Sequence, residues 1–387
     1  MTRIQTCLLA LSLGFFSQAV AEEPAQFLAV LSGQPPRVVE LGTIEATGSD
    51  LLDAQEGWFK VESGDCLAVI RRGNWTPRPS RTRVILQDGQ VLPGVLLSGD
   101  EESIRMDHLW MRELDIPLER INRIEFRSNV VVPPGELDRV VLVNGDTLEG
   151  FVNTVNDPIT IEVQREDVEK IQIPLDRAAA ISFGGPPKSA SWPQVWTLDG
   201  VRISVPRVEV DASGRLNMAP HEFMVGEYER LPRINEIVAL VLDGSRFTPL
   251  AKLPVRTINT SIARRTAPPP RREDPLGVIG LSSLLLGGPA RYEFTVPPGS
   301  DRFRTTLQRP RSSRRWPSPK ILITMGDREL WSGVFEDDVE LNLPLDTGVG
   351  SGDSTLVIDV SCGSQGPVHC GVLLIDPIVL NESQGSS

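Results

Sequence analysis

The chain has 387 residues, a formal net charge of −12 and only three histidines. An acidic chain repels the phosphate backbone, so no nucleic-acid partner is expected. Aromatic residues make up 5 %, whereas glycine (33 residues) and proline (32 residues) are abundant, which is typical of an all-β chain with many turns.

Residues 1–21 have the order of a secretory signal peptide. Arg3 gives a positive start, a short apolar segment follows, and Ala19-Val20-Ala21 is a cleavage motif. A membrane anchor is the alternative reading, but the apolar segment is short and no stop-transfer charge cluster follows it. We therefore expect an exported protein, periplasmic or extracellular (including the cell surface), with no transmembrane segment after signal cleavage.

An internal repeat organises the middle of the chain. RVILQDGQVLPG, starting at Arg83, and RVVLVNGDTLEG, starting at Arg139, align at an offset of 56, and their IPL motifs, at 116–118 and 173–175, align at 57. Asp-Gly and Asn-Gly predict tight hairpin turns, and Gly94 and Gly150 predict a sharp bend in the returning strand. Each copy is predicted to form about five bent strands that close into a small barrel.

The repeat and the composition together predict the following division. Residues 1–21 are the signal peptide, 22–80 a divergent first copy, 81–130 the second copy, 137–188 the third copy, 190–252 a divergent fourth copy, 253–273 a Pro/Arg-rich linker, 274–381 a β-sandwich, and 382–387 a tail. In the first copy, VVELGTIEA is interpreted as the opening hairpin. In the fourth, RINEI from Arg233 is aligned with RINRI from Arg120. The sequence leaves open whether the copies are separate barrels or share sheets.

The copies resemble Sm-like small-barrel repeats, which occur in tandem in some exported bacterial proteins. The resemblance rests on a strand, an Asn/Asp-Gly turn, L-x-G, and then IPL-x-R-x-x-x-I-x-F, from Arg83 to Phe183. Sm-like domains often bind RNA or form rings. Since the signal peptide and the acidic charge argue against RNA, only the fold is carried over.

The C-terminal segment alternates apolar and polar residues in about eight strands, which predicts an antiparallel β-sandwich of the jelly-roll, galactose-binding-like type. It resembles an NPCBM-type carbohydrate-binding module. The marks that carry this resemblance are Phe303-Arg304, Gly326-Asp327, Leu330-Trp331-Ser332 and Asp376-Pro377. The family's Gly/His-rich opening and its tryptophan near the last strand are missing from this chain.

The candidate ligand-binding residues lie in and near a basic loop of the sandwich. Trp316 would supply an aromatic platform, and Arg314 and Arg315 would pair with an acidic or sulfated polysaccharide. Trp331 is a further candidate. For both tryptophans, structural packing is the alternative.

Glu336, Asp337 and Asp338 are the densest acidic cluster near the sandwich and are candidate Ca²⁺ ligands, with a solvated loop as the alternative. No other metal or cofactor is predicted. Cys362 and Cys370, on either side of a short segment, are predicted to form a disulfide, with two reduced thiols as the alternative. Cys66 lies in an apolar strand and is interpreted as a free core residue.

The residues with catalytic potential are few. The histidines are scattered, so neither a His-based triad nor a zinc helix can be assembled, and neither a nucleophile elbow nor a P-loop occurs. His108 and His221 are expected in surface loops. Trp58, Trp110, Trp192 and Trp196 are expected in barrel cores or between copies.

These patterns predict an exported, non-catalytic glycan-binding protein whose partner is a polysaccharide or glycoconjugate. The alternative is an envelope scaffold whose self-associating repeats contact other envelope proteins without binding sugar. Repeats alone favour the scaffold, because tandem modules raise avidity without chemistry. A glycosidase or esterase is the third hypothesis, since 51 acidic residues offer many carboxylate pairs.

Overall fold

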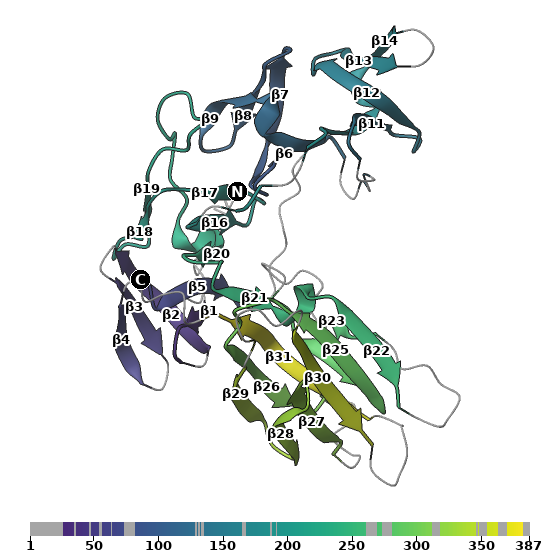
Figure 1. Cartoon of the computed structure of the whole chain (residues 1–387). Coiled ribbons are helices and arrows are strands. Elements are labelled where there is room, and N and C mark those ends of the chain that lie inside the picture. Colours follow the sequence, from purple (N-terminus) through teal and green to yellow (C-terminus); the bar gives the residue numbers. More distant parts are fainter. Residues whose placement is uncertain are drawn as a thin grey trace, which may run out of the picture.

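The computed structural model is all-β, as the sequence predicts. Its regular elements are strands and short 3-10 helices, arranged in three sheet networks (Figure 1). No helix among the described residues has the length and hydrophobicity needed to cross a membrane. The structure describes residues 26–34, 36–45, 48–53, 56–62, 64–72, 82–127, 130, 132, 135–164, 168–185, 188–190, 192–260, 269–272, 281–311, 318–345, 347, 354–362 and 370–381. The predicted signal peptide and tail lie outside them.

The second and third copies have the same order of elements, five strands with a 3-10 helix before the last. The second copy consists of β6 (Thr82–Leu86), β7 (Val91–Gly99), β8 (Ser103–His108), β9 (Arg112–Pro117), η1 (Leu118–Arg120) and β10 (Ile121–Glu125). The third consists of β11 (Asp138–Leu142), β12 (Thr147–Thr154), β13 (Ile159–Gln164), β14 (Val168–Ile173), η2 (Leu175–Arg177) and β15 (Ala178–Ser182). In each copy the first strand pairs with both the second and the fifth, which wraps the unit around its core.

Gly94 and Gly150 mark the bend at which the second strand of a copy leaves one partner for the next. Gly94 pairs with Thr82 of β6, and the following residue pairs with β8. A Cβ at Gly94 would come within 2.5 Å of the Asp107 carbonyl oxygen, and one at Gly150 within 2.0 Å of the Glu162 carbonyl oxygen. Only glycine therefore permits this close approach of two backbones.

The first and fourth copies repeat this plan in altered form. The first consists of β1 (Gln26–Leu31), β2 (Arg37–Glu45), β3 (Gly48–Asp53), β4 (Gly57–Glu62) and β5 (Cys66–Arg71). The fourth consists of β16 (Gln194–Thr197), β17 (Arg202–Ser204), β18 (Val208–Val210), β19 (Leu216–Met218), η3 (Ile234–Glu236) and β20 (Ile237–Val241). The expected opening hairpin VVELGTIEA is instead most of β2, because the buried run QFLAVL already forms the opening strand.

The predicted alignment of the fourth copy is wrong by three residues. Residues 234–236 form the 3-10 helix η3, which corresponds to η1 at 118–120. Ile237 therefore corresponds to Ile121, and Leu240 to Ile124. The shared sequence RIN was misleading because it begins just before η3 in the fourth copy, at Arg233, but at the last residue of η1 in the second copy, at Arg120.

The copies associate in two pairs through their last strands. β10 pairs antiparallel with β15, and β5 pairs antiparallel with β20. Ile124 lies opposite Ile181, and Val69 lies opposite Leu240. The two partners in each of these contacts occupy corresponding positions in their copies, so each pair has a local pseudo-two-fold axis. The copies thus share sheets, and β1 to β20 form one hydrogen-bonded network.

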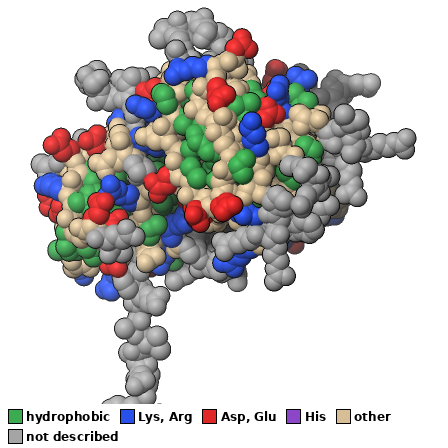
Figure 2. Space-filling view, turned by 90° about the horizontal axis from the view of Figure 1, so that it is seen from below, with side chains coloured by type: hydrophobic (Ala, Val, Ile, Leu, Met, Phe, Trp, Pro, Cys, Tyr) green, Lys and Arg blue, Asp and Glu red, His purple; other side chains and the backbone are tan. Residues whose placement is uncertain are grey.

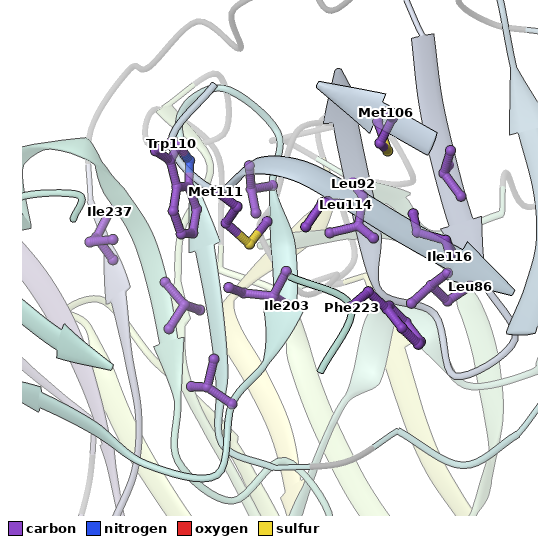
Figure 3. Close-up of a cluster of buried hydrophobic side chains, with 14 of the residues drawn as sticks. Leu86, Leu92, Met106, Trp110, Met111, Leu114, Ile116, Ile203, Phe223 and Ile237 are labelled. Carbon is purple, nitrogen blue, oxygen red and sulfur yellow. The ribbon is translucent and has the colours of Figure 1, made fainter. Parts of the chain in front are cut away.

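A continuous hydrophobic core runs through all four copies. Figure 3 shows part of it, where Leu86 of the second copy lies beside Phe223 of the fourth, and Met111 of the second lies beside Ile203 of the fourth. The segment after β19 also lies along β9, since the Asp115 N–H donates to the Phe223 carbonyl and the Val225 N–H to the Glu113 carbonyl. The copies therefore form one packed body.

The C-terminal region is the predicted β-sandwich, made of two antiparallel sheets around a separate core. One sheet contains β21 (Phe247–Pro249), β23 (Arg271–Arg272), β24 (Leu284–Gly287), β26 (Arg302–Gln308), β29 (Val339–Pro344) and β31 (Gly371–Leu380). The other contains β22 (Val255–Asn259), β25 (Ala290–Val296), β27 (Lys320–Met325), β28 (Arg328–Val334) and β30 (Ser354–Ser361). A 3-10 helix, η4 (Leu250–Lys252), follows β21.

The predicted linker 253–273 is wrong for the parts that the structure describes as strands. Val255–Asn259 pairs along β25, and Arg271–Arg272 pairs with β24. Proline and arginine suggested a solvated tether, but the backbone groups of these segments complete ladders in the two sheets of the sandwich. β21, from the predicted fourth copy, pairs with β31 as well.

The sandwich packs directly on the first and fourth copies. A third apolar cluster joins Leu28 and Val30 of β1 with Val238 of β20 and with Ile378 and Leu380 of β31. β1 is buried on both faces because its alternate residues Phe27, Ala29 and Leu31 point into the main core. Such two-sided burial explains its uninterrupted apolar sequence.

Candidate functional site

The structure describes only one of the four predicted ligand-binding residues. Trp316, Arg314 and Arg315 lie outside the described residues. Trp331 lies on β28, half-buried, and packs at the margin of the sandwich core. Its ring lies against Gly333, where a Cβ would come within 2.9 Å of it. This position fits the packing alternative.

The described face of the molecule seen from below in Figure 2 has mixed charge. Acidic and basic side chains are interspersed there around a hydrophobic patch. Glu336, Asp337 and Asp338 are exposed between β28 and β29, and Asp338 accepts a hydrogen bond from Gln308 at 2.9 Å. Nowhere in the described chain do three His, Cys, Asp or Glu side chains gather in a group that could hold a metal ion. The exposure of all three acidic side chains fits the solvated-loop alternative.

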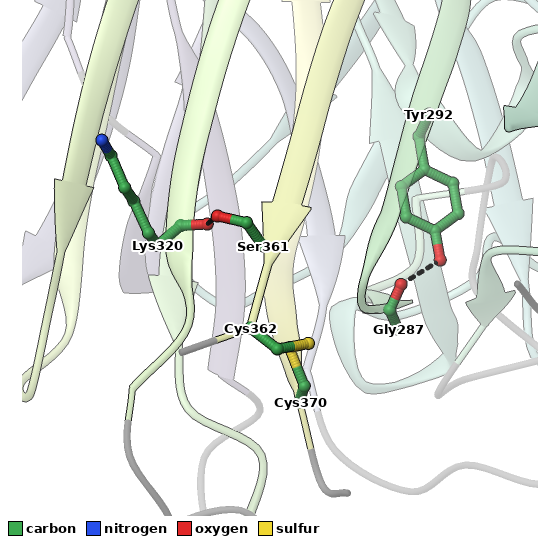
Figure 4. The surroundings of a disulfide bond; sticks show 6 residues. All are labelled: Gly287, Tyr292, Lys320, Ser361, Cys362 and Cys370. Carbon is green, nitrogen blue, oxygen red and sulfur yellow. Dashed lines mark hydrogen bonds between the residues drawn. A yellow bond between two sulfur atoms is a disulfide. The ribbon is translucent and has the colours of Figure 1, made fainter. Parts of the chain in front are cut away.

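Cys362 and Cys370 form a disulfide at one end of the sandwich (Figure 4), with Cα atoms 5.7 Å apart. Nearby, the Tyr292 hydroxyl donates to the Gly287 carbonyl at 2.6 Å, and the Ser361 hydroxyl donates to the Lys320 carbonyl at 3.0 Å. Cys66 is a buried free thiol, and burial raises its pKa to about 12. It is a core residue rather than a nucleophile.

Trp58 is the most exposed tryptophan that the structure describes, with 62 % of its surface accessible. Trp58 is therefore not in a barrel core, which was one of the two places expected for it, and it lines a cavity with Ala212 of the fourth copy. In β4, Val61 is buried and Phe59 half-buried, so strand alternation places Trp58 and Lys60 on the outer face. This alternation in GWFKVE is a signal that sequence reasoning missed.

The indole of Trp58 packs against Gly42 of β2. A Cβ at Gly42 would come within 2.4 Å of the ring, so a larger residue there would displace it. Gly42 also lies close to β3, since the same Cβ would be 2.9 Å from the Asp50 carbonyl oxygen. The absence of a side chain at Gly42 in the first copy therefore leaves the space that the exposed indole of Trp58 occupies.

Trp58 lines an open, mainly apolar cavity of about 550 Å³, in which Thr43, Asp50 and Lys60 supply the polar groups. The Thr43 hydroxyl donates to the Asp50 carboxylate at 2.8 Å. Lys60 lines the same cavity, and Ala212 from the turn between β18 and β19 closes one side. We call Trp58, Gly42, Thr43, Asp50 and Lys60 the Trp58 platform.

The chemistry of the Trp58 platform suits a sugar ring. The face of a pyranose presents C–H groups that pack on an aromatic ring, while its hydroxyls point sideways towards donors and acceptors. Asp50 is an acceptor and Lys60 a donor beside the ring, and a few fixed polar groups around an apolar surface are what a small-ligand site requires.

The two described histidines are buried, which corrects the expectation of surface loops. His108 is 2 % exposed and His221 3 %, because the second and fourth copies close over them. His108 Nδ1 accepts from the N–H groups of Trp110 and Met111, and His221 Nε2 lies 2.9 Å from the Gln90 side-chain oxygen. Burial lowers the pKa of His108 to about 3 and that of His221 to about 4. Both are neutral structural groups at ordinary pH. Trp110 is buried, as expected, and stacks on Tyr228.

Comparison with known proteins gives no family assignment. No family model matches the sequence, and no curated protein matches it. Three solved structures from Clostridium perfringens share some geometry with the chain. The CBM51 of GH95 in complex with methyl-galactose is 10 % identical, with a TM-score of 0.26, and the match covers 34 % of this chain and 99 % of that one.

The other two structures contain domains of ZmpB. CBM51-2 with INT domains, in complex with GlcNAc, is 10 % identical, with a TM-score of 0.28, over 45 % of this chain and 36 % of that one. The M60 catalytic domain with CBM51-1 and CBM51-2 is 12 % identical, with a TM-score of 0.29, over 81 % of this chain and 32 % of that one. The chain thus spans about a third of the length of these two. TM-scores at this level do not establish a common fold.

Proposed function

We propose that the mature chain is an exported, non-catalytic glycan-binding protein that holds a sugar ring on the Trp58 platform. The observation that carries the proposal is Trp58, a residue that is 62 % exposed, packs against Gly42 and lines one cavity with Asp50 and Lys60. In the free protein the apolar surface of the indole is in contact with water, which is unfavourable. A ligand whose apolar face covers the ring removes this surface from water, and its hydroxyls can form hydrogen bonds with the flanking charged groups.

The absence of catalysis is part of the proposal and is supported by the cavity lining. Glycoside hydrolysis uses two carboxyl groups that flank the scissile bond. Among the residues that line the cavity beside Trp58, Asp50 is the only carboxylate, and it accepts a hydrogen bond from Thr43. The described histidines are buried and neutral, so they do not supply an acid or base there.

Export is proposed from the composition of residues 1–21 and from the disulfide. Disulfides persist in oxidising compartments such as the periplasm and the extracellular space, and Cys362–Cys370 is such a bond. We likewise keep the Sm-like and NPCBM-type resemblances as proposals about ancestry.

Affinity electrophoresis of the full chain from Glu22 onward tests the proposal. The gels contain neutral or acidic polysaccharides, and the Trp58→Ala and Trp316→Ala variants run beside the wild type. Leu97→Ala, which removes another exposed apolar side chain, is the matched control. We expect retardation by at least one polysaccharide that is lost in Trp58→Ala and kept in Leu97→Ala.

Two other outcomes overturn different parts of the proposal. Retardation that is kept in Trp58→Ala but lost in Trp316→Ala would show that the sugar binds at the basic loop and not at the Trp58 platform. If no polysaccharide retards the wild type, the glycan-binding function is wrong.

The scaffold hypothesis also has an observation in its favour. The copies already associate through their last strands, and Val95 and Leu97 of β7 and Phe151 of β12 remain exposed. Exposed apolar strand faces suit contacts with further proteins or copies. Light scattering would support this function if it showed concentration-dependent oligomers that Phe151→Ser dissolves, and a monomer at all concentrations would contradict it.

A further inference from the structure

A second cleft, of about 870 Å³, lies between the first and fourth copies and is rich in arginine. Arg71 comes from the end of β5, Arg215 from the hairpin of β18 and β19, and Arg230 and Arg233 from the segment before η3. The whole chain carries a net charge of −12. The four arginines therefore concentrate basic side chains at one cleft of a molecule whose net charge is negative.

Two of these arginines face each other across a backbone bridge. Arg215 and Arg233 are directly opposite in an antiparallel pair, held by the Ile234 N–H, which donates to the Gly214 carbonyl at 2.8 Å. Like charges at directly opposed positions destabilise a β pair. Both side chains are exposed on the same side of this bridge, so their N–H groups are open to an anion from solution.

The other charged groups of the cleft already have hydrogen-bond or ion-pair partners. Arg230 makes a two-point ion pair with Glu236, at 2.7 and 2.9 Å, and Arg71 donates to the Asn235 carbonyl. Glu229 lies 3.3 Å from Arg112. Among the described residues, no carboxylate lies within ion-pair distance of Arg215 or Arg233. Asp211 acts on Arg215 electrostatically, but its Oδ1 accepts from Ser213 and from the Arg215 N–H to close the turn.

We infer that Arg215 and Arg233 bind an oxyanion, carboxylate or sulfate, carried by an acidic saccharide. Guanidinium groups match planar or tetrahedral oxyanions through paired N–H donors. The cleft adjoins the Trp58 platform through one hairpin, since Ala212 lines the cavity beside Trp58 and Arg215 lines this cleft. This inference rests on the proposed function, because it assigns to the same glycan chain a sugar ring at Trp58 and an acidic group at the arginines.

The test is calorimetric titration of the full chain with oligogalacturonate, dextran sulfate oligomers, neutral dextran oligomers and sodium sulfate. The variant is Arg215→Gln with Arg233→Gln. The matched control is Arg105→Gln with Arg207→Gln, which removes the same charge from exposed arginines that pair with Glu113 and Glu209. Losing charge-assisted contacts from both arginines should weaken acidic oligomers by about a hundredfold, and the control should leave them unchanged.

A second readout does not depend on sugar. Sodium sulfate should raise the melting temperature of the wild type and of the control more than that of the Arg215/Arg233 variant, at equal ionic strength set with chloride. If sulfate stabilises in this way and no saccharide of any kind binds, the anion site stands on its own, the saccharide part of the inference is wrong, and the proposed glycan function fails.

The inference is overturned while the proposed function stands if neutral and acidic oligomers bind equally and the Arg215/Arg233 variant binds both like the wild type. It is also overturned if the control pair weakens acidic oligomers as much as the test pair, because the effect would then be one of net charge.

Discussion

At the scale of single residues, the polar side chains that the fold buries determine how the molecule responds to its surroundings. His108, His221 and Gln90 lie where the second and fourth copies meet. Gln90 links His221 to other groups, because its side-chain oxygen, 2.9 Å from His221 Nε2, also accepts from the Ser204 N–H at 2.7 Å, and its NH₂ group donates to Asp88 at 2.8 Å. A protonated imidazole in this place would lose hydration, and the charge of Asp88 offsets only part of that loss at His221.

We therefore predict that acid weakens the folded state well before carboxylates titrate. An unfolded histidine binds a proton near pH 6.5, whereas burial lowers the folded pKa of His108 to about 3 and that of His221 to about 4. Since the unfolded chain binds more protons below pH 6.5, the free energy of unfolding falls as the pH falls towards these folded values. Between pH 7 and pH 5 the loss is about 2 kcal/mol for each histidine.

Urea unfolding at pH 7 and pH 5 measures this loss. His221→Gln, which keeps an amide donor for Gln90, should reduce the pH dependence by about half. A free energy of unfolding that is equal at the two pH values would show that the histidines do not differ between the folded and unfolded chain.

At the scale of elements, the sequence pattern predicted which residues form strands better than it predicted which strands pair with each other. About eight strands were expected in residues 274–381, and β24 to β31 form there, because alternation and flanking turns are local signals. The strand VRTIN was read as part of a linker, because its partner β25 lies about 35 residues further on. Pairing across such a distance leaves no mark in the local pattern.

The candidate site shows the same limit. Alternation around Phe59 and Val61 was sufficient to place Trp58 outside, but its seat on Gly42 depends on the packing of β2, β3 and β4. The arginine cleft could not be predicted, since the bridge between Arg215 and Arg233 and the end of β5 are brought together only by the pairing of β5 with β20.

The disulfide is the element-scale feature whose energetic contribution can be predicted. Cys362 and Cys370 are eight residues apart. Closing a loop of this length restricts the unfolded chain and stabilises the fold by about 2.5 kcal/mol. Replacing both cysteines by serine should lower the free energy of unfolding by this amount in a urea titration.

Reductant is the matching control for this prediction. It should destabilise the wild type by a similar amount and leave the Cys362→Ser, Cys370→Ser variant unchanged, since the remaining Cys66 is a free thiol. If the double variant is as stable as the wild type, loop closure does not stabilise the sandwich.

At the scale of the whole molecule, residues that resemble marks of a binding module serve to dock the sandwich on the first copy. Arg304 is 1 % exposed and donates to the Leu31 carbonyl at 2.7 Å and to the Gln34 carbonyl. Asp376 forms an ion pair with Arg72. The sandwich and the copies therefore behave as one body through a buried, hydrogen-bonded contact in addition to the apolar cluster.

We predict that Arg304→Met uncouples the two parts. The substitution leaves two buried carbonyl groups without their donor, which should cost about 3 kcal/mol. Scanning calorimetry should show one coupled transition in the wild type and two separate transitions in the variant. Arg328→Met, at an exposed position on β28, should leave the trace unchanged, and a single transition in Arg304→Met would contradict the docking role.

The central claim is that the Trp58 platform holds a sugar ring, and it is tested most directly by calorimetric titration of the full chain with an oligosaccharide from the polysaccharide that retards it. The account predicts binding that weakens at least tenfold in Trp58→Ala, recovers in part in Trp58→Tyr, and is unchanged in Leu97→Ala. Equal affinity of Trp58→Ala and the wild type would contradict it.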